Sequence, residues 1–222
     1  IGITRDTGGT YYVADSTNHT LRKIAAGAVV STLAGTAAQS GINDGTGAAA
    51  RFNNLYRVAA DTAGNLYVVD SHNHVLRFVT PGGLVLTLAG APGNGGFNTG
   101  PSDQARFYYP SDLVVDAAGN TYVAEAGGYM IRKLTRDGTV STLAGASRQL
   151  GFNDGGGGAA SFTEPSGIRF DTDGSLLVGD SGNQIIRRVT LAGVVTTLGG
   201  AGGQTGAMDG VGAAARFNKP LS

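Results

Sequence analysis

The sequence predicts an all-β fold of the β-propeller class, and three observations carry this prediction. Acidic, arginine, glycine and phenylalanine markers each recur every 55 residues. The first two sets are Asp15, Asp70, Glu125 and Asp180, and Arg22, Arg77, Arg132 and Arg187. Each repeat holds four short runs rich in β-branched and aromatic residues, and turns of Gly, Asn, Asp or Pro separate these runs. A fixed period of this size indicates a solenoid, a propeller or an array of one supersecondary unit.

The second repeat shows the predicted unit most clearly. Its apolar runs at 58–60, 66–69, 75–79 and 84–88 are predicted to be four strands. The turn Asp61-Thr62-Ala63-Gly64 fits a hairpin, because Asp accepts hydrogen bonds from turn amides and Gly adopts a positive φ. The runs show little strict alternation, which favours sheets that are covered on both faces, as propeller blades are.

The chain is therefore divided into four predicted four-stranded antiparallel blades and four linkers. The blades are expected at about residues 1–35, 58–90, 113–145 and 168–200, and the linkers at 36–57, 91–112, 146–167 and 201–222. Strands are expected near residues 2–6, 10–14, 20–25 and 28–33, and again every 55 residues. In the first linker, Ala48-Ala49-Ala50 predicts one helical turn, and Phe52 is expected to fill the space between two blades.

The stretch from Asn65 to Arg77 resembles the NHL repeat, which is named for an Asn-His-Leu-type signature. The signature residues here are Asn18-His19 with Leu21, and Asn73-His74 with Leu76. Residues 165–171 resemble the start of a blade in that family. The resemblance covers all four repeats, and the long linkers are similar to those of bacterial secreted or surface members. It implies a propeller that usually closes with six blades, in an extracellular, cell-surface or periplasmic protein.

Two interpretations of the blade number remain open. The chain is either part of a larger, six-bladed propeller or a closed four-bladed ring, which is within the range that propellers use. Leu221 and Ser222 occupy the repeat phase of Ile1 and Gly2, where a further blade would begin, and this favours the first interpretation. Four blades of a larger ring expose two apolar faces, so further blades of a longer chain, or self-association, are expected partners.

Composition excludes several classes of partner and site. Lys plus Arg and Asp plus Glu number 16 each among 222 residues, so the net charge of zero does not steer the molecule to nucleic acid or anionic lipid. No run of about 18 apolar residues predicts a membrane span. Because Cys is absent, a disulfide scaffold and zinc–thiolate sites are excluded. We expect no nucleic-acid partner and no cofactor.

The periodic Asp70 and Arg77 are predicted to form a structural ion pair, because single active sites rarely recur in every repeat. His72 and His74 have the i, i+2 spacing that puts two rings on one face of a strand, but they fall in the turn after the second predicted strand and lack a third ligand. Asp-Gly turns fit the linker acids better than calcium loops do. These acids are Asp44, Asp154 and Asp209. No catalytic residue and no metal site is predicted.

Residues that break the repeat are the predicted ligand site. The Gly at the start of a blade becomes Arg57 in the second blade and Asp112 in the third, with tyrosines beside both. Tyr offers a flat apolar body with a polar tip, and Arg adds a fixed fork of donors. The predicted site comprises Tyr56, Arg57, His72, Tyr108, Tyr109, Asp112 and Tyr129, on the face lined by linkers. An ion pair between neighbouring blades is the alternative role for Arg57 and Asp112.

The sequence thus predicts a non-catalytic binding or interaction module that presents its linker-lined face to a protein or a glycan. Long loops on a rigid ring are where binding residues tend to lie. The alternative is a metal-dependent propeller enzyme of lyase or lactonase type, because the NHL resemblance extends to enzymes that use metal-bound histidines near the central channel.

Overall fold

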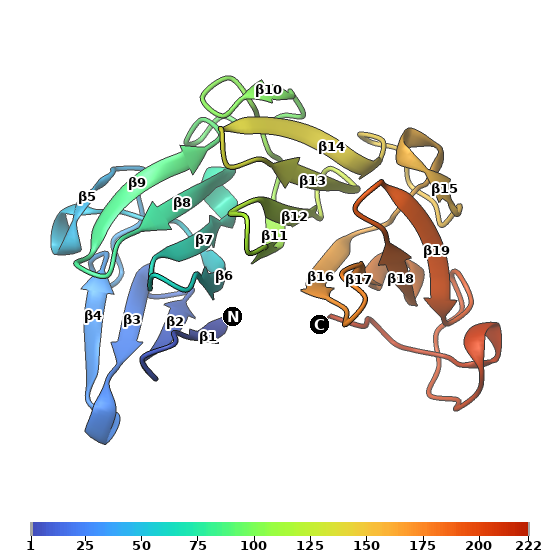
Figure 1. The fold of residues 1–222 in the computed structure, drawn as a ribbon, viewed down its shortest axis with the longest axis horizontal. Coiled ribbons are helices and arrows are strands. Elements are labelled where there is room, and N and C mark those ends of the chain that lie inside the picture. Colours follow the sequence, from blue (N-terminus) through green and yellow to red (C-terminus); the bar gives the residue numbers. More distant parts are fainter. Residues whose placement is uncertain (1, 222) are drawn as a thin grey trace.

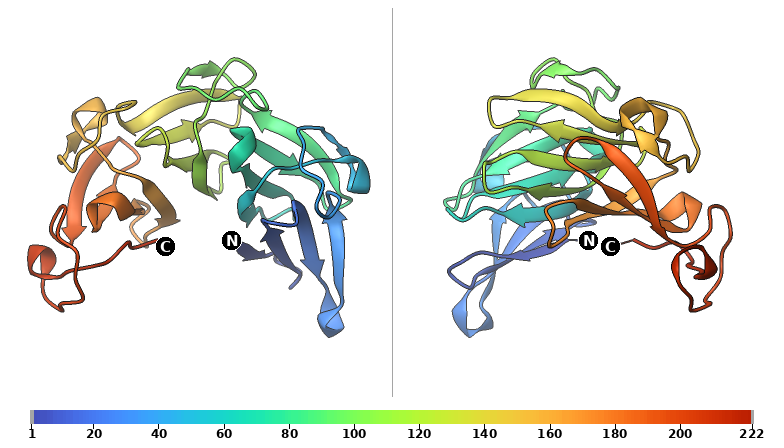
Figure 2. Two further views of the ribbon diagram at one scale, coloured as in Figure 1. Left: turned by 180° about the vertical axis from the view of Figure 1, so that it is seen from behind. Right: turned by 45° about the vertical axis from the view of Figure 1, so that its right-hand side comes forward.

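The computed structural model describes residues 2–221 and confirms the predicted all-β fold built from propeller blades. Four separate antiparallel sheets stand side by side along an arc (Figure 1). The first strand of each sheet lies on the inner side of the arc and the fourth on the outer side. The two ends of the chain face each other across the opening of the arc, as both views in Figure 2 also show.

Each blade contains four consecutive strands close to the predicted positions. The first blade holds β1 (Ile3–Arg5), β2 (Tyr11–Asp15), β3 (Thr20–Ile24) and β4 (Val30–Ala34). The second holds β6 (Leu55–Ala60), β7 (Leu66–Asp70), β8 (Val75–Val79) and β9 (Leu84–Ala89). The third holds β11 (Pro110–Val115), β12 (Thr121–Glu125), β13 (Met130–Leu134) and β14 (Thr139–Gly145). The fourth holds β16 (Pro165–Phe170), β17 (Leu176–Asp180), β18 (Ile185–Val189) and β19 (Val194–Gly199).

Three blades carry a short fifth strand that the sequence did not predict. The linkers supply β5 (Gly45–Thr46), β10 (Gly100–Pro101) and β15 (Gly155–Gly156), which pair antiparallel with β9, β14 and β19. Each of these linkers therefore covers the outer edge of the blade that it leads into. Five of these six residues are Gly or Pro, which are depleted in strands, and a two-residue strand is too short to show alternation, so the pairing depends on the path of the linker in space.

Short 3-10 helices complete the described chain. They are η1 (Ala26–Ala28), η2 (Gly47–Ala49), η3 (Ser71–Asn73), η4 (Gly157–Ala159), η5 (Ser181–Asn183) and η6 (Gly212–Ala214). The helical turn predicted at Ala48-Ala49-Ala50 is present as η2. Among residues 2–221, no helix is long and apolar enough to cross a membrane.

The hydrophobic core lies between neighbouring blades. Phe52, which is fully buried, shares one apolar cluster with Leu21 of the first blade and Leu66 of the second. Phe162 is also fully buried and packs in a cluster that joins the third blade to the fourth. The linker phenylalanine therefore fills the space between blades, as predicted. Burying a side chain of this size stabilises the fold by roughly 1.5–3 kcal/mol.

The periodic acid–arginine pair is fully buried in the second, third and fourth blades, where a linker passes over it. In the second blade, Arg77 lies 3.0 Å from Asp70, and neither side chain is exposed. Arg77 also donates to the carbonyl oxygens of Ile42 and Arg51 in the linker, and the Asp70 carboxylate accepts the N–H of Asn53. The pair thus ties a linker to the blade that follows it, which is a structural role of the predicted kind.

Two linker acids have a further role that Asp-Gly turns alone do not explain. Asp44 forms an ion pair with the buried guanidinium of Arg77 and accepts the N–H of Thr87 at 2.9 Å. Asp154 pairs with Arg187 at 2.9 Å. These carboxylates are the second counter-ions of buried arginines. The sequence spacing could not show this, because the partners lie 33 residues apart.

Candidate ligand-binding face

The linkers and the turns between second and third strands meet at one end of the blades. The N–H of His72 donates to the carbonyl of Asn53 at 3.2 Å, and the N–H of Gly182 donates to the carbonyl of Thr163 at 2.8 Å. We call this end the linker face. The turns that join first to second strands, and third to fourth strands, lie at the other end, which we call the opposite face.

Five aromatic rings gather on the linker face between the second and third blades. We call this group, consisting of His72, His74, Phe97, Tyr108 and Tyr109, the aromatic cluster. The Tyr108 ring stacks on His74 with centroids 5.3 Å apart, and Tyr109 meets His74 edge-on at 4.6 Å. His72 lies 5.6 Å from Tyr109, and Phe97 lies 5.6 Å from Tyr108. Tyr108 and Tyr109 are 40% and 41% exposed, so the cluster presents open aromatic surface to solvent.

The signature histidine fixes this cluster through a backbone contact. His74 follows η3 in the left-handed conformation, with φ of 60°, and its Nδ1 accepts the N–H of Tyr109 at 3.2 Å. The same contact joins His19 to Asn54 at 3.1 Å and Gln184 to Lys219 at 2.6 Å. In each case the acceptor and the amide are 35 residues apart. An acceptor side chain at this repeat position therefore holds the following linker in place.

Two glycines make room for Tyr108 within the cluster. A Cβ atom on Gly95 would approach the Tyr108 ring to 2.8 Å, and one on Gly127 would approach the Tyr108 carbonyl oxygen to 2.6 Å. Gly127 belongs to the segment 126–129, where the third blade departs from the Ser-x-Asn-His pattern. Gly127 stands at the variable position of that pattern, as Gly182 does in the fourth blade, and its lack of a side chain leaves room for the Tyr108 backbone.

The protonation state of His74 matters for the cluster. Burial, and to a lesser extent the charge of His72, lowers the pKa of His74. A neutral ring whose Nδ1 accepts a hydrogen bond carries its proton on Nε2. Protonation would turn Nδ1 into a donor and would break the bond to the Tyr109 amide.

A second group of predicted residues lies on the inner strands. Asp112 of β11 pairs with Arg57 of β6 at 3.1 Å and with Arg169 of β16 at 3.0 Å. Its carboxylate also accepts the N–H groups of Leu113 and Ile168, and its side chain is 1% exposed. Burial raises the pKa of Asp112, and the two arginines oppose this rise. The arrangement is an ion pair between neighbouring blades, which was the alternative interpretation of Arg57 and Asp112.

The predicted site residues thus fall into separate places. The structure brings His72, Tyr108 and Tyr109 together in the aromatic cluster. Tyr56 is 42% exposed on β6, and Tyr129 takes the left-handed position of His74 in the third blade, with φ of 61°. Within residues 2–221, neither of these two rings pairs with an aromatic ring of the cluster.

Three residues of this region were missed by the sequence argument: His74, Phe97 and Arg148. The Arg148 guanidinium lies 5.2 Å from the centroid of the Phe97 ring. Phe97 has Phe152, Ile42 and Ala207 as its repeat counterparts, so its position carries no regular signal. His74 is a signature residue of the repeat, and the sequence predicts only a structural role for it. The two neighbouring tyrosines were the available signal, because their counterparts in other repeats are not aromatic.

The two histidines have no third metal-ligating side chain grouped with them among residues 2–221. In the part of the chain from residue 2 to residue 221, no three His, Cys, Asp or Glu side chains are grouped so as to hold a metal ion. His72 and His74 lie at a 3-10 turn rather than on a strand. The ring of His72 is 3.3 Å from the side-chain amide of Asn54.

Comparison with known sequences gives a limited match. No family model matches the chain. A stretch of 93 residues, 41% of the chain, is 33% identical to Protein SUPPRESSOR OF QUENCHING 1, chloroplastic, from Arabidopsis thaliana. The match covers 9% of that protein.

Solved structures share the fold over most of this chain. An auxiliary nutrient binding protein from Bacteroides thetaiotaomicron has a TM-score of 0.69 at 18% identity, and the match covers 88% of this chain and 47% of that one. Virginiamycin B lyase from Staphylococcus aureus has a TM-score of 0.60 at 15% identity, with 89% and 54% covered. A chain of a nidogen/laminin complex has a TM-score of 0.64 at 18% identity, with 91% and 65% covered. At these identities the likeness shows the β-propeller fold alone, and this chain spans about half the length of the first two proteins.

Proposed function

We propose that residues 1–222 form an NHL-type β-propeller domain that acts as a non-catalytic binding module for a protein or a glycan. The observation that carries this proposal is the aromatic cluster, in which Tyr108 and Tyr109 are 40% and 41% exposed on a rigid frame. Aromatic side chains held in this way supply a large contact area with little loss of conformational entropy on binding.

Contacts with His74 fix the positions of both tyrosines. His74 stacks on the ring of Tyr108 and accepts the amide of Tyr109. Arg148 adds a cation at the edge of the cluster, above Phe97. An aromatic platform with a flanking guanidinium suits the apolar face of a sugar ring or an aromatic anchor of a protein partner.

The names of the structural neighbours support a binding role without defining the ligand. One is described as an auxiliary nutrient binding protein, and another belongs to a nidogen/laminin complex. Lyase-type and putative gluconolactonase propellers share the fold as well, but no residue grouping described above favours an enzyme of that kind. We place the domain in an extracellular, cell-surface or periplasmic bacterial protein, in line with the NHL resemblance.

The proposal is tested by screening the purified chain on a glycan array and against a displayed peptide library, and then measuring the affinity of the best ligand by calorimetry. We expect Tyr108→Ala and Tyr109→Ala to weaken binding by about tenfold or more, as for interface anchors. Tyr56→Ala is the matched control, because Tyr56 is equally exposed but lies outside the cluster. If both cluster variants keep native stability and full affinity, the ligand binds elsewhere.

A further inference from the structure

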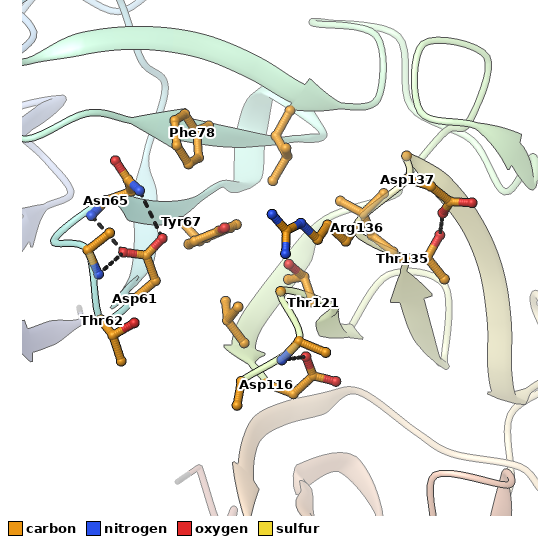
Figure 3. A pocket seen from close by; sticks show the side chains of 18 of the residues that line it. Asp61, Thr62, Asn65, Tyr67, Phe78, Asp116, Thr121, Thr135, Arg136 and Asp137 are labelled. Carbon is orange, nitrogen blue, oxygen red and sulfur yellow. Dashed lines mark hydrogen bonds between the residues drawn. The ribbon is translucent and has the colours of Figure 1, made fainter.

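A cavity of about 850 Å³ opens between the second and third blades on the opposite face, away from the aromatic cluster. Its rim consists of the turns 61–65, 116–119 and 135–138 (Figure 3). Its apolar wall is formed by Ala60, Phe78, Leu88, Val115 and Leu134. A volume of this size is within the range of small-molecule sites, roughly 300–1,000 Å³.

The side chains around the cavity differ from those at the same positions between the next two blades. Phe170 packs edge-on against Tyr122 at 5.7 Å, and Tyr122 is 1% exposed. The repeat counterpart of Phe170 is the smaller Val115, and the counterpart of Tyr122 is Tyr67, which is only partly buried and lines the cavity. Val115 thus supplies no ring at this position, and the Tyr67 side chain lines the cavity.

Two hydrogen-bond donors converge on this space. Arg136, in the turn between β13 and β14, extends into the cavity toward Tyr67 (Figure 3). Its repeat counterparts are Ala26, Pro81 and Leu191, so this cation is peculiar to the third blade. Among residues 2–221, the Arg136 guanidinium has no ion-pair partner, and the Tyr67 hydroxyl has no hydrogen bond.

The two tyrosines that are repeat counterparts of Tyr67 each donate their hydroxyl to an aspartate, whereas, within residues 2–221, the Tyr67 hydroxyl does not. Tyr12 donates to Asp6 at 3.1 Å and Tyr122 donates to Asp116 at 3.4 Å. Burial, and next the charge of Asp61, raises the pKa of Tyr67, while Arg136 opposes the rise. The hydroxyl therefore stays protonated at neutral pH and is available as a donor to a ligand.

The acidic residues of the rim are engaged in their own turns. Asp61 accepts the N–H groups of Ala63 and Asn65 and the side-chain amide of Asn65, all at 2.9 Å. Asp116 makes the equivalent bonds in the next blade. The Asp137 carboxylate accepts the hydroxyl of Thr135, and in Figure 3 this pair lies on the far side of Arg136 from Tyr67. The rim acids are thus engaged, while the Arg136 guanidinium and the Tyr67 hydroxyl remain available to a ligand, together with lining hydroxyls such as those of Ser102 and Thr62.

We propose that this cavity binds a small organic acid, with its carboxylate between the Arg136 guanidinium and the Tyr67 hydroxyl. The apolar body of the ligand, an aromatic ring, lies against Phe78 and Val115. The planar fork of Arg matches a carboxylate, and the hydroxyl supplies a further donor to the same group. This site is independent of the proposed function on the linker face.

The first test is an NMR titration of the 15N-labelled chain with phenylacetate. We expect saturable shifts of backbone amides in 61–65, 116–119 and 135–138, while the amides of the aromatic cluster stay in place. Phenylacetamide, which keeps the shape but not the charge, is expected to bind at least tenfold more weakly, and so is the cation phenethylamine. Absence of saturable shifts with phenylacetate, shifts centred on the linker face, or equal binding of phenethylamine would overturn the proposal.

The second test uses variants in the same titration. We expect Arg136→Ala to weaken phenylacetate binding at least tenfold and Tyr67→Phe to weaken it by a smaller factor. Val115→Phe places in the cavity the ring that Phe170 supplies in the next blade, and should abolish binding. Arg148→Ala is the control on the linker face and should bind as the wild type does. If Val115→Phe does not fold, the first two variants still decide, and unchanged affinity in Arg136→Ala refutes the site.

Discussion

The acid–arginine pair of the first blade differs sharply from its copies in the other three. Arg22 and Asp15 lie 3.8 Å apart, with side chains 33% and 27% exposed. Arg77 and Asp70 lie 3.0 Å apart, and both side chains are fully buried. The residues are the same type at the same repeat position, so the difference comes from their surroundings. Among residues 2–221, no linker crosses the pair of the first blade, whereas a linker closes over each of the others.

The linker changes the energetics of the pair. It places the ring of Phe52 against the guanidinium of Arg77, with 5.8 Å between the ring centroid and Cζ. It also supplies carbonyl oxygens that accept the N–H groups of that guanidinium. An exposed pair is worth roughly 0–1 kcal/mol, whereas removing one partner of a buried pair costs about 3–5 kcal/mol. The repeat therefore specifies the residues, and the crossing linker determines how much the pair stabilises the fold.

The largest predicted effect separates these two pairs. We expect Arg77→Ala to lower the free energy of unfolding by about 3–5 kcal/mol, because Asp70 is left buried without its counter-ion. Arg22→Ala should lower it by about 1 kcal/mol or less, because solvent screens the exposed pair. Urea unfolding followed by circular dichroism measures both. Equal losses in the two variants would show that linker closure does not set the strength of the pair.

In the third blade, a different pair of residues fills the space beside the buried arginine. Blades two and four use Asp with an Asn three residues later, and the side chain of Asn183 donates to Asp180 at 2.7 Å. The third blade has Glu125 with Gly128, and a Cβ atom on Gly128 would collide with the Glu125 carboxylate. Burial raises the pKa of Glu125 to about 7 and that of Asp180 to about 6, and the paired arginines oppose both shifts.

A double-mutant cycle at these positions sharpens the comparison. We expect Glu125→Asp and Gly128→Asn to destabilise the protein when made singly, by about 1–3 kcal/mol each, because one leaves a gap and the other overpacks. The double variant reproduces the residues of blades two and four and should recover about 1–2 kcal/mol as coupling energy. Thermal and urea unfolding of all four proteins give the cycle. Strict additivity would mean that the two positions do not share one space.

The smallest predicted effect concerns pH and the signature residue. The pKa of His74 is lowered below 6.5 in the folded chain, so the unfolded chain binds more protons. The stability contributed by His74 is therefore fully present above about pH 6.5 and is lost as the pH falls through the folded pKa. His74→Gln copies Gln184 of the fourth blade, keeps an acceptor for the Tyr109 amide, and should remove this part of the pH dependence. Unfolding curves between pH 5 and pH 8 test this, and an unchanged profile in the variant would contradict it.

Much of the fold could be predicted from the sequence because its determinants are local and repeated. The strand positions follow from apolar runs and turns, and they agree with the structure to within a few residues in every blade. Phe52 as the filling between blades and Asp70 with Arg77 as a buried pair follow from a marker that recurs in each unit. The candidate site could be predicted only in part: His72, Tyr108 and Tyr109 come together, whereas Arg57 and Asp112 form an ion pair on the inner strands.

By itself, the sequence determined the blade, since period, strand pattern and turn chemistry all lie within one repeat of 55 residues. Only the tertiary structure decided what forms between blades. The fifth strands, the second counter-ions Asp44 and Asp154, the contact of His74 with Tyr109 and the cavity beside Arg136 all join segments that the chain brings together from different repeats or linkers. Such contacts depend on the path of a linker and on which side chains face one another across two blades, and neither leaves a periodic signal in the sequence.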